Sequence, residues 1–305
     1  MSNKIGFNVL SFHVDDHKSN RDYRKRIRNT GAGIWLPDVN AANPIILGRY
    51  MDVGCKWLQD TTGNDVKIRT YGKSTINPWN LRNFIECCKI LGANPIVGVS
   101  VFQPVNEAVF MVRAIRNYGF TNPIYLCVGN ESYLGKVRDP ETGWPDDYPA
   151  EQYIETYRKI KAAIDDIGVQ YGAVLVDAVK WPSPNRNEWD TKVLAALGRD
   201  IDWGSIHIYD KTAGQAQDIA ERHHASSPDL PFIVTEWNHP KHGEMIDSED
   251  IYSWTLDMLQ LWESLPYVIG HTIWDSSCGL AWKLFEKNYE PTIQWRAFEA
   301  FARKD

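Results

Sequence analysis

The chain has 305 residues, and 43% of them are hydrophobic, which is enough for a large buried core. Its net charge of −6 argues against a nucleic-acid partner, because such proteins usually gather lysine and arginine on one face. No apolar run reaches the length of a transmembrane helix, so the sequence predicts no membrane partner.

The five cysteines show no spacing typical of a metal site or a redox motif. Most of them lie within apolar runs, which predicts reduced core thiols and a reducing compartment. The first residues lack the basic and apolar pattern of an export signal. We therefore expect a cytoplasmic protein without a cofactor, unless an export signal has been removed. The sequence leaves the oligomeric state open.

Short apolar runs alternate with longer amphipathic runs along the chain. The short runs predict strands, and the runs with apolar residues at helical spacing predict helices. The predicted strands cover residues 5–12, 65–71, 94–102, 123–131, 171–180, 203–209, 231–236 and 267–274. The predicted helices cover residues 44–59, 77–91, 106–118, 149–167, 190–197, 213–225, 248–265 and 292–303.

This strict alternation predicts parallel strands joined by right-handed crossovers. Eight such units in 305 residues fit an α/β fold, a single (β/α)8 or TIM barrel. An open doubly wound sheet is the alternative, but no glycine-rich phosphate loop follows the first strand. No linker rich in proline, glycine or serine interrupts the pattern, so residues 1–305 are predicted to form one domain.

Two glutamates end two of the predicted strands. Glu131 ends the run 123–131, and Glu236 ends the run 231–236. A carboxylate at the mouth of a buried strand is costly unless it is solvated, paired or used. The chemistry of a barrel sits at the carboxyl ends of its strands, so the two glutamates could face each other across one site. Glycoside hydrolysis needs such a pair, with one acid and one nucleophile or base.

Other polar residues are predicted at the same end of the barrel. Arg69 and Tyr71 end the second predicted strand, and His207 and Tyr209 end the sixth. Because side chains alternate along a strand, the two members of each pair share a face. These residues are therefore candidates for contacts with a ligand.

The end of the fourth predicted strand breaks this simple alternation. Asn130 and Glu131 are consecutive, so a bulge or the start of a loop must turn one of them inward. Trp181 follows the fifth strand and Trp274 ends the eighth. Their flat rings are candidate platforms for a sugar.

Four short motifs, in this order and at strand ends, resemble clan A of the glycoside hydrolases. Members of that clan are (β/α)8 barrels with an Asn-Glu pair ending the fourth strand and a glutamate ending the seventh. The resemblance covers nearly the whole chain at the level of the fold. The motifs are Gly129-Asn130-Glu131, His207-Ile208-Tyr209, Thr235-Glu236-Trp237 and Ile273-Trp274.

The resemblance implies a retaining glycoside hydrolase that cleaves β-glycosidic bonds in an oligo- or polysaccharide by double displacement. It implies that Glu131 is the acid/base and Glu236 the nucleophile. Asn130 would bind the sugar 2-hydroxyl, Tyr209 would hydrogen-bond the nucleophile, and Arg69 would keep the nucleophile ionised. The expected partner is thus a carbohydrate substrate.

The remaining residues of the expected site are aromatic or basic. Trp274 would form the floor of the subsite for the sugar under attack. Tyr71, His207, Trp181 and Trp237 complete the expected substrate contacts.

Two alternative functions come from other classes. A barrel that has lost catalysis could bind sugars, and its two glutamates would then be structural ion pairs at the rim. A metal-dependent hydrolase is the other alternative, but the chain lacks an HExxH spacing, and we expect no metal. Of the histidine clusters, the pair at 223–224 is predicted to face solvent. The clusters considered lie at residues 13–17, 223–224 and 239–242.

Overall fold

The fold was analysed in a computed structural model of the chain. It describes residues 4–9, 49–60, 78–99, 101, 105–129, 149–176, 179–180, 187–209, 211–239, 249–274, 284–285 and 290–303.

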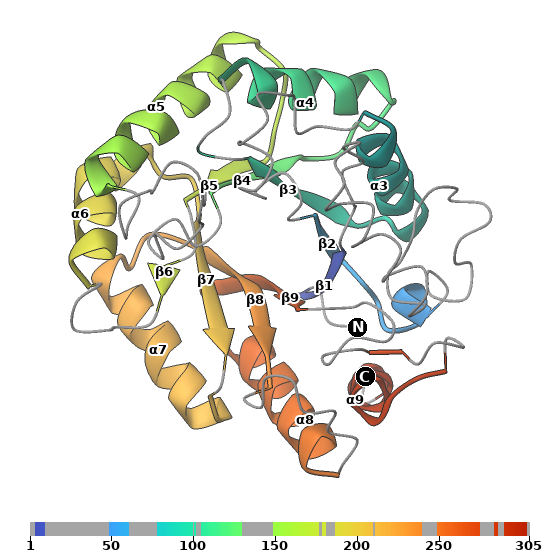
Figure 1. The fold of residues 1–305 in the computed structure, drawn as a ribbon. Helices are drawn as coiled ribbons and strands as arrows, with labels where there is room; N and C mark the ends of the chain where they lie inside the picture. The colour runs from blue at the N-terminus through green and yellow to red at the C-terminus, as the bar shows by residue number, and fades with distance from the viewer. Residues whose placement is uncertain are drawn as a thin grey trace, which may run out of the picture.

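The described strands form one parallel sheet that curls into a ring (Figure 1). Their order in the sheet is β5-β4-β3-β2-β1-β9-β8-β7-β6. The strands are β1 (Ile5–Val9), β2 (Trp57–Asp60), β3 (Asn94–Val99), β4 (Tyr125–Val128), β5 (Ala173–Leu175), β6 (Val179–Lys180), β7 (Gly204–Tyr209), β8 (Phe232–Asn238) and β9 (Val268–Ile273).

The ring closes where β5 and β6 share one strand position. β5 pairs with β4, β6 pairs with β7, and Leu175 forms a parallel bridge with Trp203. The backbone N–H of Val176 also donates to the carbonyl of Trp203 at 3.0 Å. The nine described strands thus make eight positions of a nearly closed barrel, and the prediction of a (β/α)8 barrel is confirmed.

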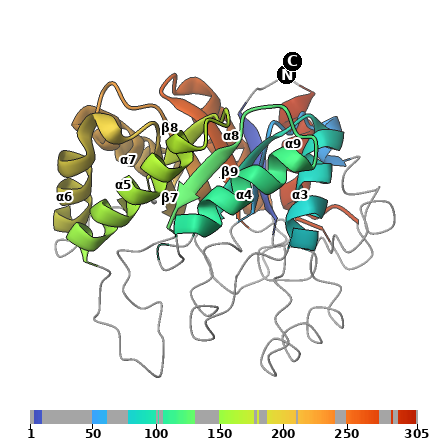
Figure 2. The same cartoon turned by 90° about the horizontal axis from the view of Figure 1, so that it is seen from above.

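Helices cover the outside of this ring (Figures 1 and 2). Within the described residues, no helix is both long and apolar enough to span a membrane. The helices are α3 (Pro78–Leu91), α4 (Val105–Asn117), α5 (Ala150–Asp166), α6 (Asn187–Leu197), α7 (Ala213–Ser226), α8 (Glu249–Ser264) and α9 (Ile293–Ala302).

The second strand lies earlier in the chain than the sequence predicts. β2 covers Trp57–Asp60 and pairs with both β1 and β3, so it takes the second position that the sequence assigned to residues 65–71. Residues 65–71 themselves lie outside the described residues. The predicted helix at 44–59 is helical at 49–52 but ends before β2. Gly54 at φ 74° provides the turn between them, a conformation that favours glycine.

The two faces of the sheet bury different clusters. The outer face packs against the helices through a large apolar core. At the amino-terminal end of the barrel the interior is filled by Trp57, Tyr125 and Trp203, and the last two rings stack at 4.7 Å. Gly270 makes room for this group, because an added Cβ would lie 2.6 Å from Nε1 of Trp57. This aromatic floor closes one end of the barrel and leaves the chemistry to the other.

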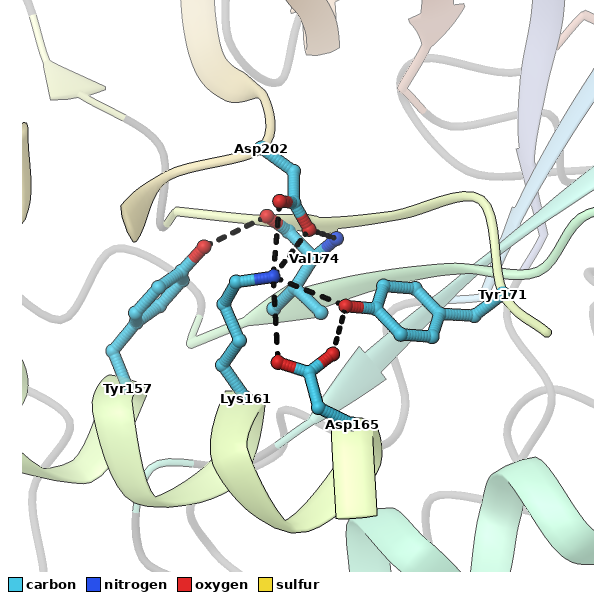
Figure 3. A network of polar contacts seen from close by, with 6 residues as sticks. All are labelled: Tyr157, Lys161, Asp165, Tyr171, Val174 and Asp202. Atoms are coloured by element: carbon cyan, nitrogen blue, oxygen red, sulfur yellow. Dashed lines mark hydrogen bonds and ion pairs between the residues drawn. The ribbon is translucent and has the colours of Figure 1, made fainter. Parts of the chain in front are cut away.

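A polar network holds the closing seam of the barrel (Figure 3). The backbone N–H of Val174 in β5 donates to Asp202 at 2.9 Å, and its carbonyl accepts from the Tyr157 hydroxyl at 2.8 Å. Lys161 donates to Asp202 and to the Tyr171 hydroxyl, each at 3.0 Å. These side chains satisfy backbone groups where the ladder between β5 and β7 is short.

Two buried histidines, His223 in α7 and His271 in β9, lie between the sheet and the surrounding helices. Burial lowers the pKa of His223 to about 4, and the neighbouring His224 adds to this shift. The His223 ring packs edge-on against Phe232, so the prediction that this histidine faces solvent is wrong. Burial lowers the pKa of His271 to about 3, and the charge of Lys4 adds to it. Both histidines are therefore neutral in the folded protein near neutral pH.

We expect the free energy of unfolding to fall as the pH is lowered from about 6.5 towards 4. In this window the unfolded chain takes up protons on both histidines and the folded protein does not, so acid favours unfolding. The contribution approaches about 1.4 kcal/mol per pH unit for each histidine. Denaturant unfolding should be measured at several pH values across this range. The slope of the unfolding free energy against pH should be smaller for His223→Leu than for the wild type, by the equivalent of about one proton.

The comparison of the two proteins cancels the carboxyl groups that titrate in the same range. Above about pH 7.5 both should show the same pH dependence, because His223 is then neutral in both states. Equal slopes for the wild type and His223→Leu in the acid window would contradict the assignment.

Candidate active site

An extra residue in β8 turns Glu236 towards the barrel interior. On one side, Ile206 pairs with Val234 and His207 pairs with Glu236, so two adjacent residues of β7 span three of β8. The ladder to β9 shows the same shift, between Val234 and Trp237. This is a β-bulge at Thr235. Strict alternation from the inward-facing Ile233 would have aimed Glu236 at the helices instead.

Glu236 meets two side chains from the neighbouring strand β7. The Tyr209 hydroxyl donates to Oε2 of Glu236 at 2.7 Å. Nδ1 of His207 lies 3.4 Å from the same oxygen. His207 and Tyr209 share the inner face of β7, because Ile206 and Ile208 pack in the outer core. The structure thus brings three of the predicted site residues together.

This carboxyl group is nearly enclosed. The side chain of Glu236 is 8% exposed and that of His207 is 3% exposed. A buried carboxylate is costly unless polar groups contact it, and the Tyr209 hydroxyl donates to this one. The contact with His207 is an ion pair only when the imidazole carries a second proton. A carboxylate held in this way at a strand end can act as a nucleophile or as a base.

Trp274 lies at the end of the next strand, β9, and is half-buried. Its backbone N–H donates to the carbonyl of Trp237 at 3.0 Å. Its carbonyl accepts a hydrogen bond from the side-chain amide of Asn238. Both backbone groups of Trp274 are therefore fixed by the end of β8, which sets the place from which its ring projects.

Asn238 is a buried residue of this region that the sequence analysis did not identify. Its Oδ1 accepts from the backbone N–H of His239 at 2.7 Å and from the side-chain amide of Gln294 at 3.1 Å. It thus joins the ends of β8 and β9 to α9. Two of its partners, Trp274 and Gln294, are 36 and 56 positions away in the sequence, so no local pattern indicates them.

The expectation that Trp237 contacts substrate is corrected by the structure. Its side chain is fully buried on the outer face of β8, opposite Glu236. The ring packs near Trp254 and Trp262, and its Nε1 donates to Nδ1 of His271 at 3.2 Å. Trp237 is therefore part of the core between the barrel and α8.

Five of the predicted site residues lie outside the described residues. The described part of β4 ends at Val128 and is followed by Gly129, whose N–H donates to the carbonyl of Val99 at 2.8 Å. Gly129 has a φ of 89°, so the backbone leaves extended geometry directly before the Asn-Glu pair. The described strand at the second position of the barrel is β2. The five are Arg69, Tyr71, Asn130, Glu131 and Trp181.

The described residues contain neither a group of metal ligands nor an exposed thiol. Among the described residues, no three His, Cys, Asp or Glu side chains are grouped as metal ligands. The four described cysteines are free and buried. Burial raises the pKa of Cys55 and of Cys87 to about 12, which keeps these thiols protonated and unreactive.

No protein-family model and no curated protein matches the chain. Several solved structures do. A GH128 endo-β-1,3-glucanase from Amycolatopsis mediterranei, solved with laminaritriose, has a TM-score of 0.59 and 12% identity, covering 98% of this chain and 100% of that one. AbfB, a family 51 α-L-arabinofuranosidase from Bifidobacterium longum, has a TM-score of 0.67 and 13% identity, covering 98% and 72%.

A GH39 β-xylosidase from Caulobacter crescentus gives a similar result, with a TM-score of 0.59 and 15% identity, covering 83% of this chain and 65% of that one. At this level of identity the likeness concerns the fold. The chain has the barrel fold of these glycoside hydrolases, the fold that its resemblance to clan A implied.

Proposed function

We propose that the protein is a retaining glycoside hydrolase that cleaves β-glycosidic bonds in an oligo- or polysaccharide. The observation that carries the proposal is the enclosed side chain of Glu236 near the C-terminal end of β8. Its carboxyl group accepts a hydrogen bond from the Tyr209 hydroxyl at 2.7 Å. Glu236 is the nucleophile, and Glu131 is the acid/base in the same site.

The physical setting of Glu236 suits attack on an anomeric carbon. In the first step an oxygen of Glu236 attacks that carbon, while Glu131 gives its proton to the leaving oxygen. In the second step Glu131 takes a proton from water, and the water releases the sugar from Glu236. The hydrogen bond from Tyr209 and the neighbouring imidazole of His207 fix the direction of the carboxyl group before the substrate binds.

The proposed role of Glu131 follows from its place in the chain. It comes two residues after Gly129, where the described part of β4 has ended at the active end of the barrel. A retaining mechanism requires its carboxyl to lie about 5–5.5 Å from that of Glu236, whereas an inverting one requires about 6.5–9.5 Å. We propose the shorter separation.

The solved structures suggest which glycans to try first. The endo-β-1,3-glucanase aligns with nearly all of this chain and is itself covered over its whole length. Oligosaccharides with β-1,3-linked glucose are therefore the first substrates of choice, followed by aryl β-xylosides and aryl β-glucosides. Only the fold supports this order, since one barrel hosts many specificities.

Replacing the proposed nucleophile tests the function directly. Glu236→Gln should lower kcat by at least about 10⁴-fold, the scale seen when a covalent nucleophile is removed. The melting temperature should not fall, because the amide keeps the shape and can still accept from Tyr209. Glu249→Gln, at an exposed glutamate in the first turn of α8, is the matched control and should keep full activity.

The same experiment separates an enzyme from a sugar-binding protein. Calorimetry with the Gln variant should still detect the oligosaccharide, because binding does not need the nucleophile. Sugar binding by the wild type without turnover of any β-glycoside would instead support the non-catalytic alternative.

The role of Glu131 has its own signature. Glu131→Ala should slow hydrolysis of natural glycans by about 10²–10⁴-fold, the usual contribution of general acid–base catalysis. Dinitrophenyl glycosides need no proton on the leaving group, so their first step should stay fast. Added azide should then restore turnover and yield a β-glycosyl azide, detected by mass spectrometry and NMR. An α-glycosyl azide would contradict retention.

Loss of the tyrosine hydroxyl should weaken the nucleophile without unfolding the barrel. Tyr209→Phe removes one hydrogen bond to a charged group, a contribution of about 1.5–3 kcal/mol. We therefore expect kcat to fall by about 10- to 100-fold with a smaller change in KM. Tyr252→Phe in α8 provides the control. Unchanged kinetics in Tyr209→Phe would show that the 2.7 Å contact has no catalytic role.

A further inference from the structure

The bulge that aims Glu236 is held from both sides by threonine hydroxyls. On the β9 side, Oγ1 of Thr272 donates to the carbonyl of Thr235 at 2.5 Å. On the β7 side, Oγ1 of Thr235 donates to the carbonyl of Ile206 at 3.5 Å. Both threonines are fully buried. Side-chain bonds thus join the bulged residue to its neighbours at the point where the regular ladder is interrupted.

The hydroxyl of Thr272 has only one proton and can therefore donate to only one of its two neighbours. Its Oγ1 lies 3.0 Å from the side-chain amide of Gln59 as well as 2.5 Å from the Thr235 carbonyl. A carbonyl can only accept, so the proton points to Thr235, along the shorter contact. The atom of Gln59 at 3.0 Å is Oε1, and turning this amide by 180° would let its NH₂ group donate to the Thr272 hydroxyl. Contacts of the Thr272 hydroxyl thus link Gln59 in β2 to Thr235 in β8 across the barrel interior.

We propose that Thr272 is a positioning residue for Glu236. Its hydroxyl fixes the peptide between Thr235 and Glu236 and so sets the direction in which the carboxyl group leaves the strand. The contact through which Thr272 acts is the one to the backbone carbonyl of Thr235. Its catalytic consequence rests on the proposed glycosidase function, whereas its structural consequence can be measured without any substrate.

The variant that isolates the hydroxyl is Thr272→Val, which keeps the branched shape and removes the donor. Thr272→Ser restores a hydroxyl at the same position and is the rescue variant. Thr255→Val is the matched control, because Thr255 in α8 is fully buried and its Oγ1 has no hydrogen-bond partner among the described residues. The three variants therefore change one buried threonine each and differ in whether a bond to the bulge is lost.

Crystal structures of these variants give the first readout. In Thr272→Val the 2.7 Å contact between the Tyr209 hydroxyl and Oε2 of Glu236 should be lost, whereas Thr272→Ser and Thr255→Val should keep it. If Thr272→Val does not fold, Thr272→Ala removes the same donor without the extra methyl group. Persistence of the contact in a folded variant without the hydroxyl overturns the proposal, whatever the activity.

Kinetics give the second readout. Misplacing a reacting group by about 1 Å can cost about 100-fold in rate, so kcat of Thr272→Val should fall by about 10- to 100-fold. KM should change by less than about threefold, because the substrate contacts remain. Thr235→Val should have a smaller effect, since its bond is 3.5 Å rather than 2.5 Å long. An equal loss of kcat in Thr255→Val would overturn the proposal by showing a general effect of altered packing.

The two readouts keep this proposal separate from the proposed function. A wild-type protein without glycosidase activity would refute the function, and the crystal structures would still decide whether Thr272 positions Glu236. An active wild type with a fully active Thr272→Val variant would refute the positioning role alone.

Discussion

The extra residue in β8 is the constraint on which the rest of the site depends. A shift of one residue exchanges the two faces of a strand, so the bulge decides at once what lies inside the barrel and what lies outside. It places Glu236 beside Tyr209 and sends Trp237 into the core against α8. Burial of a large indole is among the strongest apolar contributions available to a fold. The packing of Trp237 therefore helps to hold a carboxyl group in a place that would otherwise be unfavourable.

Polarity rises along the interior of the barrel from one end to the other. The amino-terminal end is closed by the rings of Trp57, Tyr125 and Trp203. Above these rings lies a layer of small polar groups, in which the Ser205 hydroxyl donates to the Val176 carbonyl at 2.8 Å. The carboxyl end carries the histidine, the tyrosine and the glutamate described above. The aromatic rings fill the interior at one end, and the middle layer supplies hydrogen bonds between the strands below Glu236. This order matches the division of such barrels into a stability end and a functional end.

Sequence periodicity was sufficient for the architecture because each strand and helix carries its own local pattern. The alternation in β7 predicts that His207 and Tyr209 share one face, as they do in the structure. It failed at β2, whose four residues follow a helical stretch after only a short turn and continue its apolar spacing. The sequence does not predict the bulge or the roles of Thr272 and Asn238, for a different reason. Their long-range partners lie at least 29 positions away, and no local window contains both ends of these bonds.

The residues around Glu236 indicate whether this glutamate serves the stability of the fold or a reaction. A glutamate that served only stability would be replaceable by an apolar residue of similar volume, since a buried ionised group seldom strengthens a fold. Here a hydroxyl at 2.7 Å and an imidazole at 3.4 Å lie beside one carboxyl oxygen. A strand distortion and two hydroxyl bonds serve the same placement. Such an arrangement costs stability in the barrel and gains nothing for packing at position 236, so a function of the carboxylate itself is the simplest reason for it.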